Sequence, residues 1–227
     1  MGGSLPDGRI QENPVKDRRD FIRANTALIA PPHVPEIRLH LADEAHELWH
    51  RTEAELEAIG LEPPFWAFAW AGGQGLARYV LDHPETIAAK RVVDFATGSG
   101  LVAIAAMKAG AASVLASDID PFCAAAVALN AAANGVTVET TDRDLVGETP
   151  DCDVLLAGDV FYDRAFAERL VPWLRELTAA GITVLVGDPG RAYLPRDRLA
   201  ELARYKVPVT RILEDAEVKR TTVWQFV

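Results

Sequence analysis

The chain has 227 residues, a length that suits one ordinary domain with a sizeable core. Its 23 basic and 33 acidic side chains give a net charge of −10, which argues against nucleic-acid binding and favours a partner with a cationic surface. No stretch is long and apolar enough to span a membrane, and the amino terminus lacks the hydrophobic core of a signal peptide. We therefore expect a cytoplasmic protein. The cysteines and histidines form no metal-binding pattern, so no metal is expected.

Two segments differ in character along the chain. Residues 1–35 are rich in proline, glycine and charge and are expected to form a short, mobile N-terminal arm. Residues 36–227 are expected to form the single domain. The elements expected before residue 90 are a short helix over residues 21–28, a strand over 37–41, a helix over 44–59 and a helix over 76–81.

From residue 91 onward, short apolar runs alternate with helical segments. The expected strands cover residues 92–95, 113–117, 136–140, 154–158 and 182–186. The expected helices cover residues 101–109, 121–134 and 164–179. This alternation is typical of parallel strands covered by helices on both faces. The last two expected strands, over 207–213 and 221–227, are joined by a polar turn. We therefore predict an α/β protein with a Rossmann-like sheet that ends in a C-terminal antiparallel hairpin.

A glycine-containing loop, Thr97-Gly98-Ser99-Gly100, lies between an expected strand and an expected helix, which is the context of a nucleoside-binding loop. Without a Cβ, Gly98 can take the tight turn, and Gly100 lets the backbone approach a bound nucleoside. Asp118, with Ile119 beside it, follows the next strand, where a carboxylate can accept both ribose hydroxyls. The alternative is a glycine turn in an α/β core with a solvated aspartate. Because the strand, the glycine loop, the helix and the acidic residue follow one another at the expected spacing, the sequence favours a nucleoside site.

The loop alone does not separate S-adenosylmethionine from a nicotinamide dinucleotide, but three features favour S-adenosylmethionine. A dehydrogenase normally needs a further domain, for which this chain has little length. The terminal hairpin suits the sheet of a methyltransferase. Asp94, inside the strand before the loop, would face the ammonium group of the methionine, whereas in a dinucleotide site it would face the like charge of a pyrophosphate. Asp94 could instead cap the loop backbone, so this third feature stays open.

The expected fourth strand of the sheet ends in Gly158-Asp159-Val160-Phe161-Tyr162. In an open parallel sheet the ligand crevice lies outside the carboxyl ends of the strands, so Asp159 and Tyr162 would lie beside the transferred methyl group. Enzymes that methylate amides or adenine place two prolines here, and this chain has Val160 and Phe161 instead. A carboxylate with aromatic neighbours better suits an amine acceptor.

Several motifs together resemble the electron transfer flavoprotein β-subunit lysine methyltransferases, a group of seven-β-strand enzymes with an Asp-x-x-Tyr motif after the fourth strand. The motifs are Pro64-Phe65-Trp66, Trp70-Ala71-Gly72-Gly73, the loop from Asp94 to Gly100, Asp118-Ile119-Asp120-Pro121, and Asp159 to Tyr162. The resemblance covers residues 35–227 and extends more weakly to ribosomal protein L11 methyltransferase. It implies a class I methyltransferase sheet of seven strands that binds S-adenosylmethionine. It also implies that Asp159 and Tyr162 contact the lysine and that the cofactor is held by Trp70, Gly98, Gly100, Asp118 and Asp144.

The resemblance implies methyl transfer to a lysine amine of a protein, with the electron transfer flavoprotein β subunit as the expected substrate. Our hypothesis is that Asp159 and Tyr162 orient the amine while Trp66 and Phe161 exclude water from it. Trp66 and Trp70 are four residues apart and could belong either to the core or to the site. The alternatives are a methyltransferase of ribosomal proteins or of a small-molecule amine, and a non-catalytic nucleoside-binding module.

Overall fold

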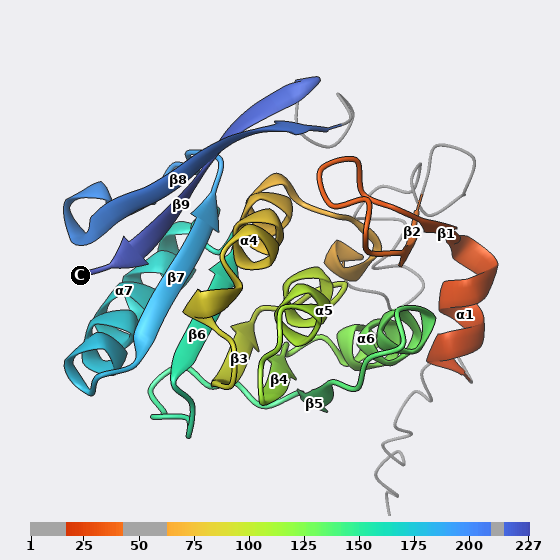
Figure 1. Cartoon of the computed structure of the whole chain (residues 1–227), viewed down its shortest axis with the longest axis horizontal. Helices are drawn as coiled ribbons and strands as arrows, with labels where there is room; N and C mark the ends of the chain where they lie inside the picture. Colours follow the sequence, from red (N-terminus) through yellow and green to blue (C-terminus); the bar gives the residue numbers. More distant parts are fainter. Residues whose placement is uncertain (1–16, 43–62, 210–215) are drawn as a thin grey trace, which may run out of the picture.

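The computed structural model describes residues 17–42, 63–209 and 216–227 and contains a seven-stranded sheet in the order β5-β4-β3-β6-β7-β9-β8 (Figure 1). In that order the strands are β5 (Glu139–Thr141), β4 (Ser113–Ser117), β3 (Arg91–Phe95), β6 (Val154–Gly158), β7 (Thr183–Asp188), β9 (Val218–Phe226) and β8 (Leu199–Pro208). The first five run parallel, and β9 is antiparallel to both β7 and β8. The predicted Rossmann-like sheet with a C-terminal antiparallel hairpin is confirmed.

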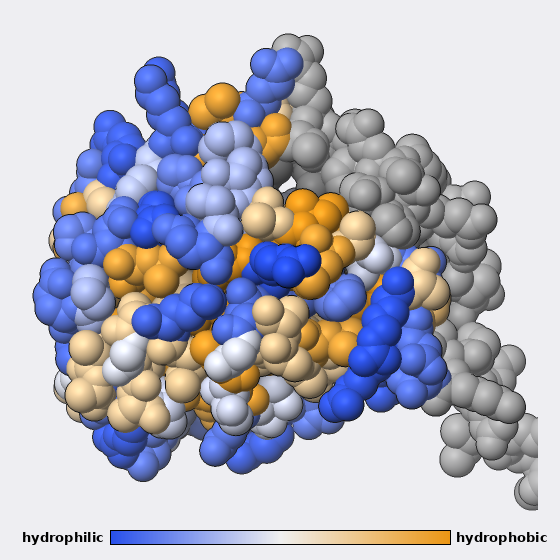
Figure 2. All heavy atoms as spheres, turned by 45° about the vertical axis from the view of Figure 1, so that its right-hand side comes forward, coloured by the Kyte–Doolittle hydropathy of each residue, from blue (hydrophilic) through white to orange (hydrophobic). Residues whose placement is uncertain are grey.

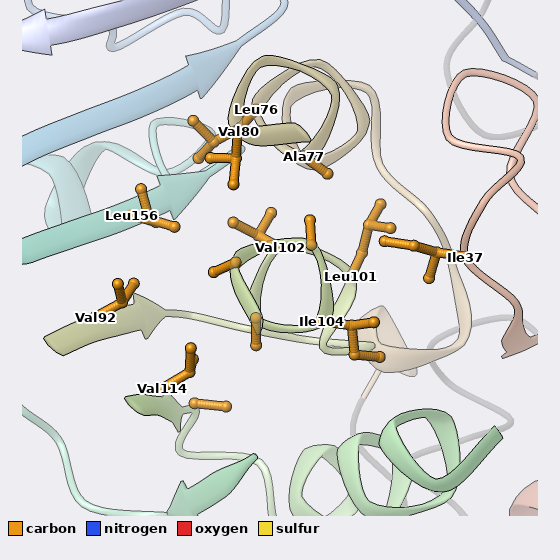
Figure 3. Packing of buried hydrophobic residues seen from close by; sticks show 14 of the residues in the cluster. Ile37, Leu76, Ala77, Val80, Val92, Leu101, Val102, Ile104, Val114 and Leu156 are labelled. Atoms are coloured by element: carbon orange, nitrogen blue, oxygen red, sulfur yellow. The ribbon is translucent and has the colours of Figure 1, made fainter. Parts of the chain in front are cut away.

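The strands of the sheet centre are buried on both faces, and alternate residues supply two separate cores. Along β3, Val92 belongs to a cluster with helices α4 (Ala71–Asp82) and α5 (Leu101–Lys108), whereas Val93 belongs to a cluster with α7 (Arg164–Ala179). Figure 3 shows side chains of α4 and α5 pointing toward those of β3, β4 and β6. Helices thus cover both faces of the sheet (Figure 1). Because β3, β6 and β7 run parallel, their carboxyl ends lie at the same end of the sheet.

A third core joins the N-terminal segment to helix α6 (Pro121–Ala133). Helix α1 (Arg18–Asn25) is capped by Asp17 and buries Ile22 against α6, where Trp66 and Phe122 also pack. Strands β1 (Ala27–Ile29) and β2 (Leu39–Leu41) then form an antiparallel pair. Residues 17–35 of the predicted mobile arm are thus packed on the domain, and the expected boundary at residue 35 falls between two paired strands.

Other element boundaries differ from the predictions for identifiable reasons. The first hairpin strand, expected over 207–213, is β8 at Leu199–Pro208, where a register shift between Glu201 and Ala203 interrupts the alternation; residues 210–213 lie outside the described residues. Helix α4 begins at Ala71 rather than residue 76, because its glycines, which are poor helix formers, obscure its first turns. Strand β5 lies at 139–141 rather than 136–140. The helix expected over 44–59 lies outside the described residues.

The surface of the described part mixes apolar and hydrophilic residues, as Figure 2 shows for one face. Its exposed large apolar side chains include Phe65, Ile119 and Tyr162, each of which belongs to a motif of the predicted site. None of the helices in the described ranges is long and apolar enough to cross a bilayer. The predicted site therefore includes three exposed apolar side chains.

Candidate active site

The predicted nucleoside loop follows β3 and opens helix α5. Its backbone takes left-handed φ values at Ala96 (54°), Gly98 (52°) and Gly100 (80°). Such values favour glycine, and a Cβ added to Gly100 would lie 3.0 Å from the Val127 side chain. The loop therefore requires glycine at position 100 for both its conformation and its packing against α6, and the close approach to a nucleoside that we expected there stays a prediction.

The Asp118 carboxylate lies at the end of β4, directly across from this loop. Its Oδ2 accepts a hydrogen bond from the Gly98 N–H at 2.9 Å, and its Oδ1 accepts one from the Asp120 N–H at 3.1 Å. Ile119, next to it, is 71% exposed. A carboxylate that ends a strand beside a glycine loop, with an exposed apolar residue adjacent, fits the ribose and the flat base of a nucleoside.

Asp94 lies inside the loop rather than facing outward. Its side chain is buried, and Oδ2 accepts hydrogen bonds from Thr97 Oγ1 at 2.5 Å and from the Ala103 N–H at 2.9 Å. Burial raises the pKa of this carboxyl to about 7. Asp94 therefore caps the loop backbone, which was the second of the two expectations, and the like-charge argument against a dinucleotide loses its basis. Ser99 is also buried, and its carbonyl accepts from Asn130 Nδ2.

Asp159 occupies a tight cradle at the end of β6. Its φ is +57°, an uncommon value for aspartate, and its N–H donates to the Gly187 carbonyl of β7 at 2.9 Å. Its Oδ2 accepts from the Gly73 N–H of α4 at 2.9 Å. A Cβ at Gly72 would lie 2.5 Å from this oxygen and 2.3 Å from the Gly187 carbonyl oxygen. The close approach of α4 to β6 and β7 therefore requires glycine at position 72.

Arg191 completes the surroundings of Asp159, and the sequence reasoning missed it. Its Nη2 and Nε donate to Asp159 Oδ1 at 2.7 and 3.1 Å, and its guanidinium carbon lies 5.9 Å from the centre of the Trp70 ring. The Arg191 side chain is 21% exposed and that of Asp159 10%. The guanidinium thus lies nearer the solvent than the carboxylate it neutralises. The signal available in the sequence was Asp188-Pro189-Gly190-Arg191, a turn that follows the fifth parallel strand.

Exposed aromatic rings lie beside this ion pair. Phe65 is 47% exposed and Tyr162 54%, and their ring centres are 5.9 Å apart. Trp70 lies 5.9 Å from Phe65 and donates from Nε1 to the Phe65 carbonyl at 3.1 Å. A Cβ at Gly98 would lie 3.7 Å from the same carbonyl oxygen. The Phe65 backbone therefore connects the aromatic cluster of Phe65, Trp70 and Tyr162 to the nucleoside loop.

Two predicted site residues lie in the core. Trp66 is only 2% exposed and stacks on Phe122 in the core beneath α1, with ring centres 5.6 Å apart. Phe161 is fully buried in the α7 core. Neither ring can line an open acceptor site, whereas the neighbouring Phe65 is 47% exposed and contacts Trp70. Asp144 forms an ion pair with Arg169 at 2.7 Å, which lowers the pKa of its carboxyl, and its expected position near the adenine stays a prediction.

The chain is similar in sequence to known methyltransferases. A family model described as ribosomal protein L11 methyltransferase (PrmA) matches residues 78–181. The chain is 38% identical over 215 residues to the electron transfer flavoprotein beta subunit lysine methyltransferase of Xenopus laevis, with 92% of this chain and 86% of that protein covered. It is 33% identical over 217 residues to the human protein of the same name, with 91% and 80% covered.

Among solved structures, the fold resembles that of ribosomal protein L11 methylase from Lactobacillus delbrueckii subsp. bulgaricus. The TM-score is 0.50 at 22% identity, and 70% of this chain and 80% of that chain are covered. The parallel sheet with the antiparallel β9 is the fold of a class I methyltransferase, and the similarity to named methyltransferases over most of the chain shows that this protein belongs to that S-adenosylmethionine-dependent class. The similarity over most of the chain is more specific. The chain belongs to the electron transfer flavoprotein β-subunit lysine methyltransferase family.

Proposed function

We propose that this enzyme transfers a methyl group from S-adenosylmethionine to lysine side chains of the electron transfer flavoprotein β subunit. The observation that carries the proposal is the placement of the Asp159–Arg191 ion pair and the aromatic cluster beside the nucleoside loop. The names of relatives up to 38% identical support the same substrate. The cytoplasmic location stays a prediction from the sequence.

In this proposal the cofactor is held by the loop after β3 and by the end of β4. Gly98 and Gly100 leave room for the nucleoside, the Asp118 carboxylate accepts from the ribose hydroxyls, and Ile119 covers one face of the adenine. Asp94 and Thr97 act indirectly, because they fix the loop from its inner side. S-adenosylmethionine supplies a methyl group whose bond to a sulfonium sulfur breaks as the amine nitrogen forms its new bond.

The acceptor lysine reaches this methyl group through the aromatic cluster. Phe65, Trp70 and Tyr162 give its alkyl chain an apolar passage, and their ring faces favour a cationic methylated product. Positioning supplies most of the rate in such a transfer, because little covalent assistance is needed. The same exposed rings favour a protein side chain over a small-molecule amine, which a closed pocket would suit better.

The Asp159–Arg191 ion pair affects the protonation of the acceptor lysine differently from a carboxylate without a partner. Lysine has an ordinary pKa of about 10.4 and reacts only as the neutral amine. Asp159 alone would stabilise the ammonium form, but Arg191 neutralises it and presents its own positive charge nearer the solvent. A nearby cation favours the neutral amine. We therefore assign Asp159 to positioning Arg191 and the start of α4, rather than to direct contact with the lysine as we expected from the sequence.

A second candidate substrate is a ribosomal protein, because the L11 methyltransferase family model matches residues 78–181. The test is to incubate the enzyme and tritiated S-adenosylmethionine with purified electron transfer flavoprotein or with ribosomal protein L11. Mass spectrometry then identifies the modified residue. We expect label on lysines of the flavoprotein β subunit. Labelling of L11 alone would favour the second candidate, and labelling of neither protein would contradict both.

The control for this experiment is the Asp118→Ala variant. It is expected to lose cofactor binding, because the carboxylate that meets the loop and the ribose is gone. Its far-ultraviolet circular dichroism spectrum checks that it folds. Label that persists in the variant would come from a contaminating methyltransferase and not from this enzyme.

A further inference from the structure

A pocket of about 280 Å³ lies on the antiparallel edge of the sheet. Asp188 of β7, Thr222 of β9 and Arg204 of β8 are directly paired across the three strands and form its floor. Arg220 and Trp224 lie two residues to either side of Thr222 along β9 and so share its face. The loop that follows β7 forms one wall. The opposite face of β9 is the one that packs on α4, so the pocket opens on the other side of the sheet.

Two buried polar atoms in this pocket have no partner in the described part of the chain. Asp188 is 1% exposed, and its Oδ1 accepts from the Gly190 and Arg191 N–H groups at 2.6 and 2.7 Å. Its other oxygen, Oδ2, makes no hydrogen bond there, nor does Trp224 Nε1. Buried polar groups are rarely left unpaired, because each costs free energy. Both atoms are shielded from solvent, so they mark one unmet acceptor and one unmet donor within the wall of the pocket.

The charge around the pocket is positive although the chain as a whole carries −10. Three arginines line it, namely Arg196, Arg204 and Arg220. Arg204 is paired with Glu201 at 2.5 Å. Arg196 and Arg220 form no ion pair with any residue that the structure describes. An anionic group is therefore the ligand that these side chains favour.

We propose that the pocket binds an acidic residue, Asp or Glu, in an extended segment of the protein substrate. The carboxylate accepts from Arg196 and Arg220, the two arginines of the pocket that form no ion pair in the described part of the chain. The buried Asp188 carboxylate disfavours a doubly charged phosphate group, which is why we assign a carboxylate. This proposal rests on the proposed function, since it assumes a protein substrate.

The position of the pocket suits this role. Asp188 is three residues before Arg191, whose guanidinium binds Asp159 at the acceptor site. A segment in the pocket would therefore lie beside the segment that delivers the lysine. The aromatic cluster recognises the lysine chain, and the pocket would add a second contact that selects among the lysines of a protein surface.

Direct binding tests the pocket without any need for activity. Titration calorimetry measures binding of hexaglutamate, hexalysine and inorganic phosphate to the enzyme and to the Arg220→Glu and Arg196→Glu variants. We expect hexaglutamate to bind the wild type and to bind both variants at least tenfold more weakly. Arg175→Glu, an equal charge change on exposed α7, is the matched control and should bind like the wild type. Equal binding to all four proteins, or phosphate binding as tight as that of the peptide, would overturn the proposal.

Kinetics then connect the pocket to the substrate. For Arg220→Glu we expect the KM for the electron transfer flavoprotein to rise about tenfold, with kcat within about twofold and the affinity for S-adenosylhomocysteine unchanged. The unchanged affinity shows that the variant folds, and Arg220→Gln should give an intermediate KM. An unchanged KM in Arg220→Glu would reject the pocket proposal and leave the proposed function standing. A wild type that methylates no protein would reject the proposed function, while the calorimetry would still decide whether the pocket binds acidic peptides.

Discussion

Arg191 is the residue whose removal should change the pH dependence of the reaction. The acceptor lysine must lose a proton, and in the proposed mechanism the Arg191 guanidinium lowers the pKa of that lysine in the enzyme–substrate complex. The substitution Arg191→Met keeps an apolar side chain but removes the charge. It also leaves the Asp159 carboxylate uncompensated. We therefore expect the bound lysine to keep its proton to a higher pH.

The size of the effect follows from the geometry of the site. The guanidinium carbon lies 5.9 Å from the centre of the Trp70 ring, and we take this length as the separation from a bound amine. Two unit charges about 6 Å apart interact by about 3 kcal/mol at an effective dielectric constant of about 20, which equals about two pKa units. Solvent screens part of this, because the Arg191 side chain is 21% exposed. We expect a shift of about one unit and, at neutral pH, a kcat about tenfold lower.

The measurement is kcat against pH at saturating protein substrate, because kcat reports groups that titrate in the enzyme–substrate complex. The midpoint of the rising limb should move up by about one unit in Arg191→Met and stay near the wild-type value in Arg191→Lys, which retains a cation. Calorimetry with S-adenosylhomocysteine checks that both variants fold. A lower plateau with an unchanged midpoint in Arg191→Met would show that Arg191 acts only on the structure of the loop, and the charge argument would fail.

Three further predictions concern the architecture of the site. Gly72→Ala should lower the free energy of unfolding, measured with urea, by about 2 kcal/mol, because its Cβ would lie 2.3 Å from the Gly187 carbonyl oxygen. The control is Gly73→Ala, whose Cβ would meet only Val102 at 4.0 Å and which should change the free energy of unfolding by less than about 0.5 kcal/mol. Asp118→Ala should weaken S-adenosylhomocysteine binding at least tenfold in calorimetry, and an unchanged affinity would remove Asp118 from the cofactor site. The carboxyl of Asp94 has a pKa of about 7 in the folded protein, so the free energy of unfolding of the wild type should fall as the pH rises from about 4 to about 7. In Asp94→Asn this fall should be smaller. If urea unfolding at pH 5 and pH 8 gave the same change in free energy of unfolding for both proteins, the assignment would be wrong.

The sheet and the nucleoside loop could be predicted from the sequence because their determinants are local. Apolar runs mark the buried parallel strands, and the glycine loop and Asp118 follow strands directly, so their place at the carboxyl edge follows from topology alone. Strand β8 could not be recognised in the same way. It alternates apolar and polar residues only from Ala203 to Pro208, because a register shift between Glu201 and Ala203 interrupts the alternation in its first half.

The acceptor site depends on contacts between distant residues, which the sequence does not display. The left-handed φ of Asp159 turns the chain so that Phe161 enters the core and Tyr162 faces outward, and no pattern of residue types reveals that turn. Phe65 and Trp66 are adjacent in a 3-10 turn, where neither helical nor strand periodicity says which ring is exposed. Arg191 is 32 residues from Asp159 and meets it only because β6 and β7 are neighbours.

The Asp188 carboxylate, at the end of β7, contributes both to the position of Arg191 and to the basic pocket. Asp188 Oδ1 accepts from the Arg191 N–H and so fixes the backbone that aims the guanidinium at Asp159, while Oδ2 of the same side chain belongs to the basic pocket. The two roles therefore predict different kinetic effects. Arg220→Glu removes only a pocket contact and should act on KM, whereas Asp188→Asn weakens the support of Arg191 as well and should also lower kcat. If Asp188→Asn changed KM alone, the loop would serve the pocket without supporting Arg191.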